Sequence, residues 1–248
     1  MKDKVALVTG AASGIGRAIA LVWAREGAHV IVSDMNREGG EETVRMVREL
    51  GRQAQFEPCD VSRPEDCEAL VAAAVRHFGR LDAACNNAGI GGDLAPTADH
   101  TLDAWNRTIA INLSGVFYGM KYQIAAMLKN GGGAIVNMAS ILGSVAMANA
   151  PAYSAAKHGV LGLTKAAALE YATQGVRVNA VGPAFIETPL ISPVTGDKAA
   201  YDALVGLHPM GRLGRAEEVA ELVLWLSSER ASYATGAYYP LDGGYLAR

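Results

Sequence analysis

Short apolar runs alternate with longer amphipathic segments along almost the whole chain of 248 residues. The apolar runs predict strands at 5–8, 30–32, 55–58, 81–85, 134–138, 176–181 and 237–241. The intervening segments predict helices at 15–26, 38–50, 64–77, 101–128, 151–174 and 216–228. Strands joined by crossover helices favour an α/β fold, in which a doubly wound parallel sheet of about seven strands carries helices on both faces.

One segment, 187–215, departs from this alternation, because it is rich in proline and glycine around a short helical pattern at 197–206. An insertion of this length in a compact domain is usually a lid or binding loop, and we expect a substrate lid here. No linker, repeat or low-complexity stretch breaks the chain, so we expect a single domain spanning 1–248. The series SRPE at 62–65 has the form of a capping box that opens the helix at 64–77.

Composition narrows the class of protein. Half of the residues are hydrophobic and 19% are charged, so a large core is available. The net charge is −3 with both signs scattered, which argues against nucleic acid as a partner.

Cys59, Cys67 and Cys85 form no C-x-x-C pair, and we expect buried thiols in a reducing compartment, with no metal site. The apolar run at the N-terminus is too short for a signal peptide, and no stretch is long enough for a membrane span. We therefore expect a soluble, cytoplasmic protein.

A glycine-rich turn follows the first predicted strand and leads into the first helix. It contains Gly10, Ser13, Gly14, Ile15 and Gly16. Glycines allow the backbone to approach a pyrophosphate closely, while the N-terminus of the helix offers free N–H groups and the positive end of its dipole. A tight turn without a ligand is the alternative, and the strand–turn–helix context favours a dinucleotide.

Asp34 ends the second predicted strand. A carboxylate at this place can accept hydrogen bonds from both ribose hydroxyls of an adenosine and repels a 2′-phosphate, which favours NAD(H) over NADP(H). Arg37 lies close by in the sequence and can weaken this preference. An aspartate that merely forms a turn is the alternative, so the choice between the two cofactors stays open at this point.

Eight short motifs occur in a fixed order along the chain: TGAASGIG (9–16), CDV (59–61), NNAG (86–89), IN (111–112), NMAS (137–140), YSAAK (153–157), RVNAVGP (177–183) and TGAYYPLDGG (235–244). Together they resemble the short-chain dehydrogenase/reductase superfamily over the entire chain, and in particular its NAD-preferring glucose and secondary-alcohol dehydrogenases. The resemblance implies a Rossmann-type sheet. This chain departs from the family pattern at Pro183-Ala184, because glycine usually follows the proline. The alanine leaves less room beside the nicotinamide.

The resemblance implies a catalytic set of Asn112, Ser140, Tyr153 and Lys157. Tyr153 would act as general acid and base, with its pKa lowered by the ammonium of Lys157 and by the positively charged nicotinamide. Ser140 would hydrogen-bond the substrate oxygen, where charge changes in the transition state. Lys157 would also hold the nicotinamide ribose, and Asn112 would anchor a water that links the lysine to solvent.

The resemblance also implies where the cofactor binds. Asp60 and Val61 match positions that hold the adenine, and Asn87 matches the position beside the nicotinamide ribose. Ile186 and Thr188 match positions that touch the carboxamide and the phosphates, and Tyr153 and Lys157 are expected to contact the cofactor as well. Asn86 and Ser154, in contrast, are expected to be structural, each binding backbone through a short polar side chain.

The predicted substrate pocket is mostly apolar. By the same alignment it is lined by Ile141, Leu142, Asn149, Ala150 and the lid, where His208 and Met210 are further candidates for contact. An apolar, uncharged lining suits a neutral, fairly hydrophobic secondary alcohol or ketone. A histidine in such a loop is more often a loop residue than a substrate ligand.

Three other functions are compatible with parts of the pattern. A 3-oxoacyl thioester reductase would use NADPH, and it commonly has a basic residue where this chain has Ser13 and lacks the acid found here at Asp34. A methyltransferase also uses a glycine turn and an acid but does not need Tyr153 and Lys157. A catalytically inactive dinucleotide sensor would not need the complete catalytic set.

The helix predicted at 151–174 is small or apolar on nearly every side. Such a helix is buried on every side, and one sheet covers only one face of it. We therefore expect a partner subunit on the other face and a homotetramer, which is also the assembly that the family resemblance implies.

Overall fold

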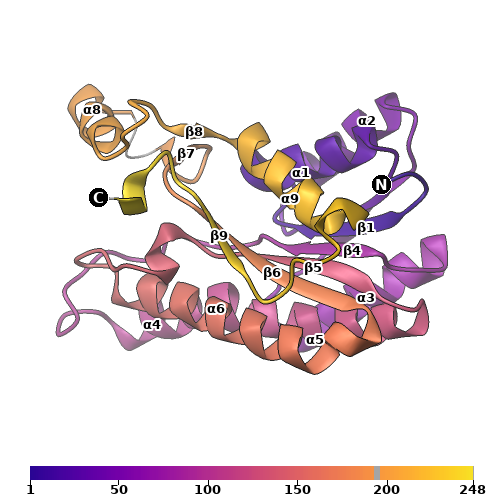
Figure 1. Ribbon diagram of the computed structural model, residues 1–248. Coiled ribbons are helices and arrows are strands. Elements are labelled where there is room, and N and C mark those ends of the chain that lie inside the picture. The colour runs from indigo at the N-terminus through magenta and orange to yellow at the C-terminus, as the bar shows by residue number, and fades with distance from the viewer. Residues whose placement is uncertain (193–195, 248) are drawn as a thin grey trace.

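The computed structural model describes residues 1–192 and 196–247. Within this part of the chain, a seven-stranded sheet has the order β3-β2-β1-β4-β5-β6-β9 (Figure 1). Its strands are β1 (Val5–Thr9), β2 (His29–Asp34), β3 (Ala54–Pro58), β4 (Ala83–Asn86), β5 (Gly133–Met138), β6 (Val176–Pro183) and β9 (Tyr238–Leu241). All neighbouring pairs are parallel. The order reverses between β1 and β4, which confirms the predicted doubly wound, Rossmann-type sheet.

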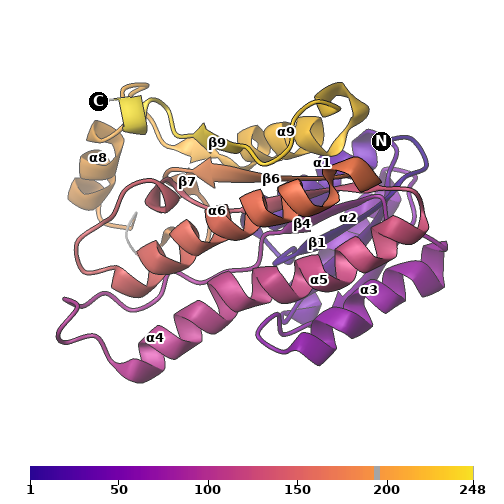
Figure 2. The ribbon, with the colours of Figure 1, turned by 60° about the horizontal axis from the view of Figure 1, so that its bottom comes forward.

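Helices cover both faces of the sheet (Figures 1 and 2). One face carries α1 (Gly14–Arg25), α2 (Arg37–Glu49) and α9 (Ala216–Ser227), and the other carries α3 (Pro64–Phe78), α5 (Gly115–Lys129) and α6 (Pro151–Tyr171). Side chains of β1 alternate between the two layers: Ala6 and Val8 join the first core and Leu7 joins the second. Because both faces are buried, the strand is a continuous apolar run, as a parallel sheet requires.

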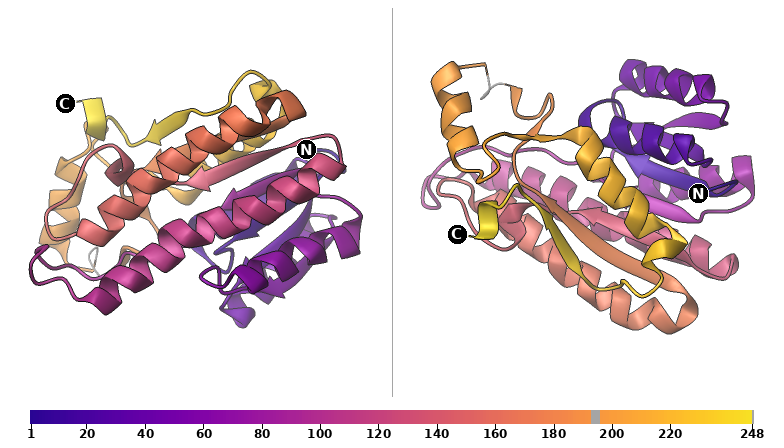
Figure 3. Two further views of the ribbon diagram at one scale, coloured as in Figure 1. Left: turned by 90° about the horizontal axis from the view of Figure 1, so that it is seen from below. Right: turned by 45° about the horizontal axis from the view of Figure 1, so that its top comes forward.

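The helix predicted at 101–128 is interrupted. Its first part is α4 (Leu102–Ile109), and a π-helical turn (Ala110–Ser114) then joins it to α5. Figure 3 shows that α4 and α5 follow one another beside α6. A π-helical turn inside a helix is frequently found at functional sites, and this turn contains Asn112.

The predicted capping box is wrong. The Ser62 hydroxyl donates to Oδ1 of Asp60 at 2.7 Å, and Ser62 lies one residue before the cap position of α3. Arg63 occupies the cap position without a side-chain hydrogen bond, and Pro64 begins the helix. Proline suits the first helical position because the N–H that it lacks would have no partner inside the helix.

The predicted lid contains two short strands that the sequence pattern did not predict, β7 (Ile186–Glu187) and β8 (Gly214–Arg215), which pair with each other. Between them lies α8 (Lys198–Gly206), close to the helix predicted at 197–206. Residues 193–195 of this segment lie outside the described residues. Among the helices that are described, none is long and apolar enough to cross a membrane.

Candidate active site

The glycine turn between β1 and α1 is shaped for close backbone approach. Gly10 and Gly14 have φ values of +65° and +51°, in the left-handed region that favours glycine. A Cβ atom at Gly16 would collide with the carbonyl oxygen of Gly10. Asn87 fixes this turn to the end of β4, because its Nδ2 donates to the carbonyl oxygens of Thr9 at 2.8 Å and Gly10 at 3.2 Å.

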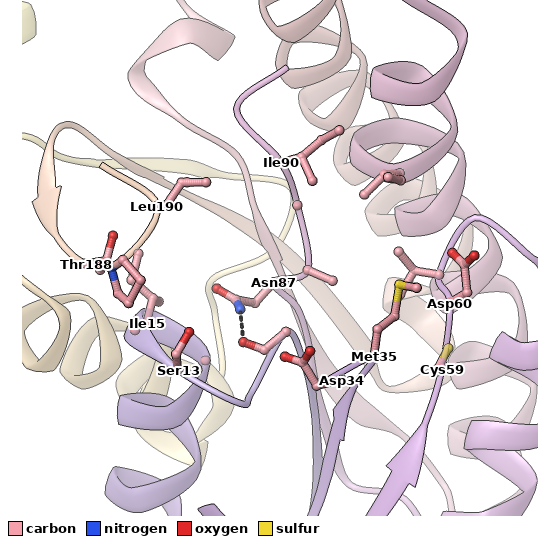
Figure 4. Close-up of a pocket in the computed structure, with 18 residues that line it drawn as sticks. Ser13, Ile15, Asp34, Met35, Cys59, Asp60, Asn87, Ile90, Thr188 and Leu190 are labelled. Atoms are coloured by element: carbon pink, nitrogen blue, oxygen red, sulfur yellow. Dashed lines mark hydrogen bonds between the residues drawn. The ribbon is translucent and has the colours of Figure 1, made fainter. Parts of the chain in front are cut away.

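A cavity of about 480 Å³ opens over this turn at the carboxyl ends of the strands (Figure 4). The residues predicted to bind the dinucleotide converge on it: Gly10, Ser13, Gly14, Ile15, Gly16, Asp34, Asp60, Val61, Asn87 and Thr188 line its wall. Thr188 comes from the predicted lid and lies directly against the turn, since a Cβ atom at Gly14 would be 3.3 Å from the side chain of Thr188. The site is thus closed on one side by the segment after β7.

The carboxylate of Asp34 is held in place by backbone. Its Oδ2 accepts a hydrogen bond from the N–H of Ala12 at 2.9 Å, and its Oδ1 accepts one from the N–H of Asn36 at 2.8 Å. Arg37 is directed elsewhere: it forms an ion pair with Glu41 at 3.0 Å, and its guanidinium lies 5.3 Å from the centre of the Phe56 ring. The nearby cation predicted to weaken the preference for NAD(H) is therefore engaged away from the cavity.

A second, smaller cavity of about 110 Å³ continues from the first, because Ile15, Asn87 and Thr188 line both. The predicted catalytic residues Ser140, Tyr153 and Lys157 lie on its wall, together with Ile186. Ser140 follows β5, whereas Tyr153 and Lys157 lie on α6. The fold therefore brings together one hydroxyl, one phenol and one ammonium from two separate elements.

Lys157 is buried, with 4% of its surface exposed, and its Nζ donates to the carbonyl oxygen of Met138 at 2.8 Å. Burial lowers the pKa of Lys157 to about 8 because the charged form loses its hydration. The ammonium also lies 5.5 Å from the centre of the Tyr153 ring. Such a contact with the face of an aromatic ring stabilises a cation.

Tyr153 differs from the sequence-based expectation. Burial raises the pKa of Tyr153, while a hydrogen bond with the side chain of Ser140 lowers it by a smaller amount. The net shift is upward, so the protein chain alone does not produce the predicted lowering. The physical reason is that burial removes the water that would stabilise the charged phenolate. The Lys157 ammonium, meanwhile, donates its hydrogen bond to the Met138 carbonyl oxygen and not to the phenol.

Asn112 has a role that the sequence did not reveal. Its Oδ1 accepts from the N–H of Ile90 at 2.9 Å, and its Nδ2 donates to the carbonyl oxygen of Ile90 at 2.8 Å. The side chain thereby ties the π-helical turn to the loop after Asn87, which lines both cavities. This contact depends on the π-helical turn between α4 and α5, and no pattern of residues in the sequence predicts such a turn.

Asn86 is structural, as predicted, but its partners are side chains and not backbone. Its Nδ2 donates to Oε1 of Gln123 at 3.1 Å and to Oδ1 of Asn137 at 2.9 Å, and its Oδ1 accepts from Nε2 of Gln123 at 2.7 Å. This buried network joins β4, β5 and α5 below the site. The buried hydroxyl of Ser154 has no hydrogen-bond partner within the described part of the chain, so the predicted backbone contact is not found there.

The predicted substrate contacts are only partly placed at the site. Ile141, Leu142 and Ala150 are buried, and none of them lines the small cavity. His208 packs against the rings of Phe185 and Tyr245, outside this cavity. Asn149 and Met210 also lie outside the lining. Leu190 and Ile191 of the predicted lid do line the small cavity, together with Ala184, so the lid and the apolar character are the parts of this prediction that the structure places there.

Comparison with known proteins places this geometry in a family. The family model described as "Enoyl-(Acyl carrier protein) reductase" matches residues 10–246. A cyclohexanol dehydrogenase from Acinetobacter sp. (strain SE19) is 48% identical over 246 residues, which cover 99% of this chain and 96% of that protein. The chain belongs to the short-chain dehydrogenase/reductase superfamily.

Other members are similar along their whole length. A cis-4-hydroxycyclohexanecarboxylate dehydrogenase from Sinomonas cyclohexanicum is 44% identical over 245 residues, or 99% of this chain and 97% of that protein. The crystal structure of levodione reductase superposes with a TM-score of 0.96 at 39% identity, covering 100% of this chain and 99% of that chain. Such relatives establish a general role as an oxidoreductase.

Solved relatives also bear on the cofactor. A xylitol dehydrogenase structure holds NAD⁺, with 35% identity, a TM-score of 0.93 and 98% of this chain covered. An Agrobacterium tumefaciens relative holds NADP, with 34% identity, a TM-score of 0.92 and 100% of this chain covered. The family thus binds a nicotinamide dinucleotide, and which of the two this chain prefers depends on its own residues.

Proposed function

We propose that residues 1–248 act as one catalytic unit that transfers hydride between NAD(H) and a neutral, fairly hydrophobic secondary alcohol or ketone. The observation that carries this proposal is the position of Ser140, Tyr153 and Lys157 on a small cavity that continues into the dinucleotide pocket. Among the described residues that line the small cavity, Lys157 is the one with a charged side chain, and the rest are mainly apolar. An unpaired charge on the substrate would therefore be poorly solvated here, which favours a neutral substrate.

The chain's own groups fit a nicotinamide dinucleotide. Gly10, Gly14 and Gly16 line the large cavity at the N-terminus of α1, where a pyrophosphate would meet backbone N–H groups. The preference for NAD(H) is supported by Asp34, which lines the large cavity with both carboxylate oxygens fixed by backbone N–H groups, and by the pairing of Arg37 with Glu41. NAD⁺, when bound, supplies the hydride acceptor.

Proton movement is assigned to Tyr153. In alcohol oxidation, the hydride leaves the carbinol carbon while the phenolate of Tyr153 takes the hydroxyl proton, and a carbonyl bond forms. Ser140 donates a hydrogen bond to the substrate oxygen and so fixes it beside the phenol. Because burial raises the pKa of Tyr153, the phenolate needs positive charge from both the nicotinamide and the Lys157 ammonium, which lies 5.5 Å from the centre of the Tyr153 ring. Asn112 holds the loop that frames the cavity.

For the substrate, we propose an alicyclic secondary alcohol or the corresponding ketone. The volume and apolar lining of the small cavity support a compact hydrocarbon ring, and two of the relatives are named for alcohols on a cyclohexane ring, one for cyclohexanol and one for a hydroxycyclohexanecarboxylate. The experiment is a panel of cyclic and linear secondary alcohols with NAD⁺ or NADP⁺, monitored by absorbance of the reduced cofactor. Faster turnover of a 3-oxoacyl thioester with NADPH than of any ring substrate would favour the alternative reductase.

We also propose a homotetramer in the reducing cytoplasm. One side of α6 packs on the sheet, while Leu169 on the opposite side is 86% exposed. Trp105 on α4 and Phe117 on α5 add exposed aromatic surface to the same layer of helices (Figure 3). Light scattering should give four times the chain mass of 25.9 kDa, and a monomer at micromolar concentration would contradict this assembly. The three described cysteines are free thiols, which agrees with a reducing compartment.

A further inference from the structure

Two side chains behind the Asp34 carboxylate join the glycine turn to α2. Arg17, on α1, donates through Nη2 to the carbonyl oxygens of Ala12 and, at 3.2 Å, of Gly39. Its Nε donates to the hydroxyl of Thr43, on α2, at 3.0 Å. One guanidinium therefore binds the turn after β1 and the first turn of α2 at the same time, and α1 and α2 lie side by side (Figure 1).

The Thr43 hydroxyl completes this connection. Thr43 is fully buried, and its Oγ1 lies 2.8 Å from the carbonyl oxygen of Ala11 and 3.0 Å from that of Gly39, either of which can accept its hydrogen. A Cβ atom at Gly39 would be 2.9 Å from the Cβ atom and the carbonyl oxygen of Ala12, so α2 packs directly on the turn. Buried polar groups with several partners hold their neighbours in one arrangement. We call Arg17 and Thr43 the clamp.

Both N–H groups that hold the Asp34 carboxylate belong to residues attached to this clamp. Ala12 donates its N–H to Oδ2 of Asp34, and its carbonyl oxygen accepts from Arg17. Asn36 donates its N–H to Oδ1 of Asp34, and its side chain accepts from the N–H of Gly39 at 3.2 Å. The carbonyl oxygen of Gly39 in turn accepts from Arg17. The position of the carboxylate thus depends on the clamp, although neither residue of the clamp lines the dinucleotide pocket.

We propose that the clamp determines cofactor specificity: Arg17 and Thr43 are positioning residues that fix Asp34 in the orientation that accepts ribose hydroxyls and repels a 2′-phosphate. This inference rests on the proposed function, because it concerns how the proposed preference for NAD(H) is enforced. A carboxylate that is already fixed needs no ordering when the ribose binds, which favours NADH. Its charge also cannot turn away from a 2′-phosphate, which disfavours NADPH.

Loss of the clamp should act on the two cofactors in opposite directions. Without the guanidinium, the carbonyl oxygen of Ala12 loses its partner, the turn shifts, and Oδ2 of Asp34 loses its backbone donor. The carboxylate can then rotate, so NADH loses a fixed acceptor and NADPH meets less repulsion. A purely structural role would differ, because it would lower thermal stability and weaken both affinities in the same proportion, leaving their ratio unchanged.

The test measures the dissociation constants of NADH and NADPH by fluorescence titration of the full-length protein, without any substrate. Thr43→Val keeps the shape of the side chain but removes the hydroxyl, and it should lower the preference for NADH about fivefold. Thr43→Ser retains the hydroxyl and should keep the wild-type ratio. Arg17→Met should lower the preference at least as far as Thr43→Val. Arg25→Met is the matched control, because Arg25 is an exposed arginine at the other end of α1, and it should leave the ratio unchanged.

A second arm tests whether the clamp acts through Asp34. In Asp34→Ser the carboxylate is absent, so there is nothing left for the clamp to position. Adding Thr43→Val to Asp34→Ser should therefore change the ratio of the two dissociation constants less than about twofold.

Two results would overturn the proposal. One is a wild-type ratio in Thr43→Val. The other is a shift of the same size in the presence and in the absence of the Asp34 carboxylate. Failure of the proposed function would appear in the wild type itself. Wild-type protein that binds NADH more tightly than NADPH but oxidises no secondary alcohol would contradict the proposed function alone, and the titrations would still decide the role of the clamp. Wild-type protein that prefers NADPH would overturn both.

Discussion

The adenosine half of the site, around Asp34 and Asp60, and the reactive half, around Tyr153 and Lys157, differ in how their polar side chains are stabilised. In the adenosine half, both carboxylate oxygens of Asp34 accept backbone hydrogen bonds, and Asp60 is held by the amide and hydroxyl of Ser62. In the reactive half, Lys157 and Tyr153 are titratable groups whose pKa values burial moves against their charged forms. In the adenosine half, hydrogen bonds within the protein therefore fix the two carboxylates in place. The second half holds groups whose charges are stable only when they are paired.

The largest effect is expected at Tyr153. Tyr153→Phe keeps the ring but removes the transferable proton, and general acid–base catalysis contributes about a hundredfold to ten-thousandfold, so we expect kcat to fall roughly a thousandfold. NADH affinity should stay within about twofold, since the phenol lies in the reactive half. Steady-state kinetics and fluorescence titration measure the two quantities. Tyr171→Phe, at the far end of α6, is the matched control and should keep full activity, whereas wild-type kcat in Tyr153→Phe would contradict the assignment.

The next effect concerns the charge of Lys157. Its pKa is about 8 in the folded protein and has an ordinary value of 10.5 in the unfolded chain. Between these pH values the unfolded chain binds more protons, so stability should rise as the pH rises through this window. Relative to Lys157→Met, the free energy of unfolding of the wild type should increase by about 2–3 kcal/mol between pH 7 and pH 10.

Urea denaturation at the two pH values measures this difference without any cofactor. Lys165→Met is the matched control, because Lys165 is an exposed lysine on the same helix and should show no such dependence. A difference between wild type and Lys157→Met that is independent of pH would show that the lysine is not buried in its charged form.

A smaller effect is expected in the adenosine half. The carboxylate of Asp34 repels a 2′-phosphate and accepts ribose hydroxyls, and we expect NAD⁺ to be preferred in kcat/KM by about tenfold or more. Asp34→Ser should reduce this preference, mainly by improving KM for NADP⁺. Initial-rate kinetics with both cofactors tests it. A native preference for NADP⁺ would mean that Asp34 has been misinterpreted.

The smallest effect is expected at Arg37. Because its guanidinium pairs with Glu41 and lies over Phe56, Arg37→Ala should change the ratio of the two kcat/KM values less than about twofold. The same kinetic assay measures this change. A large gain in selectivity for NAD⁺ in Arg37→Ala would show that the arginine reaches the site in solution.

Much of the adenosine half could be predicted from the sequence, because its requirements are local. Glycines at fixed places in a strand–turn–helix unit and an acid at the end of the next strand determine where the backbone and Asp34 lie. The sheet could be predicted for the same reason, since most of its strands are short apolar runs. Right-handed crossovers then limit the possible orders of these strands.

The rest depends on contacts between distant segments. The hydrogen bond from Lys157 to Met138 and the two bonds between Asn112 and Ile90 join elements that no spacing rule connects. The capping prediction at Ser62 failed because α3 begins at Pro64, one residue later than a cap at Ser62 requires, and Arg63 takes the cap position. The raised pKa of Tyr153 depends on burial, which sequence spacing does not report.

The central claim is that hydride moves from a ring carbinol to NAD⁺ while Tyr153 moves the proton. The most direct measurement uses cyclohexanol that carries deuterium on the carbinol carbon, with NAD⁺ and wild-type protein, followed by mass spectrometry of the reduced cofactor. The account predicts reduced cofactor that contains one transferred deuterium, together with cyclohexanone. Reduced cofactor without deuterium, or no reduction of NAD⁺ by cyclohexanol or any other secondary alcohol of the panel, would contradict it.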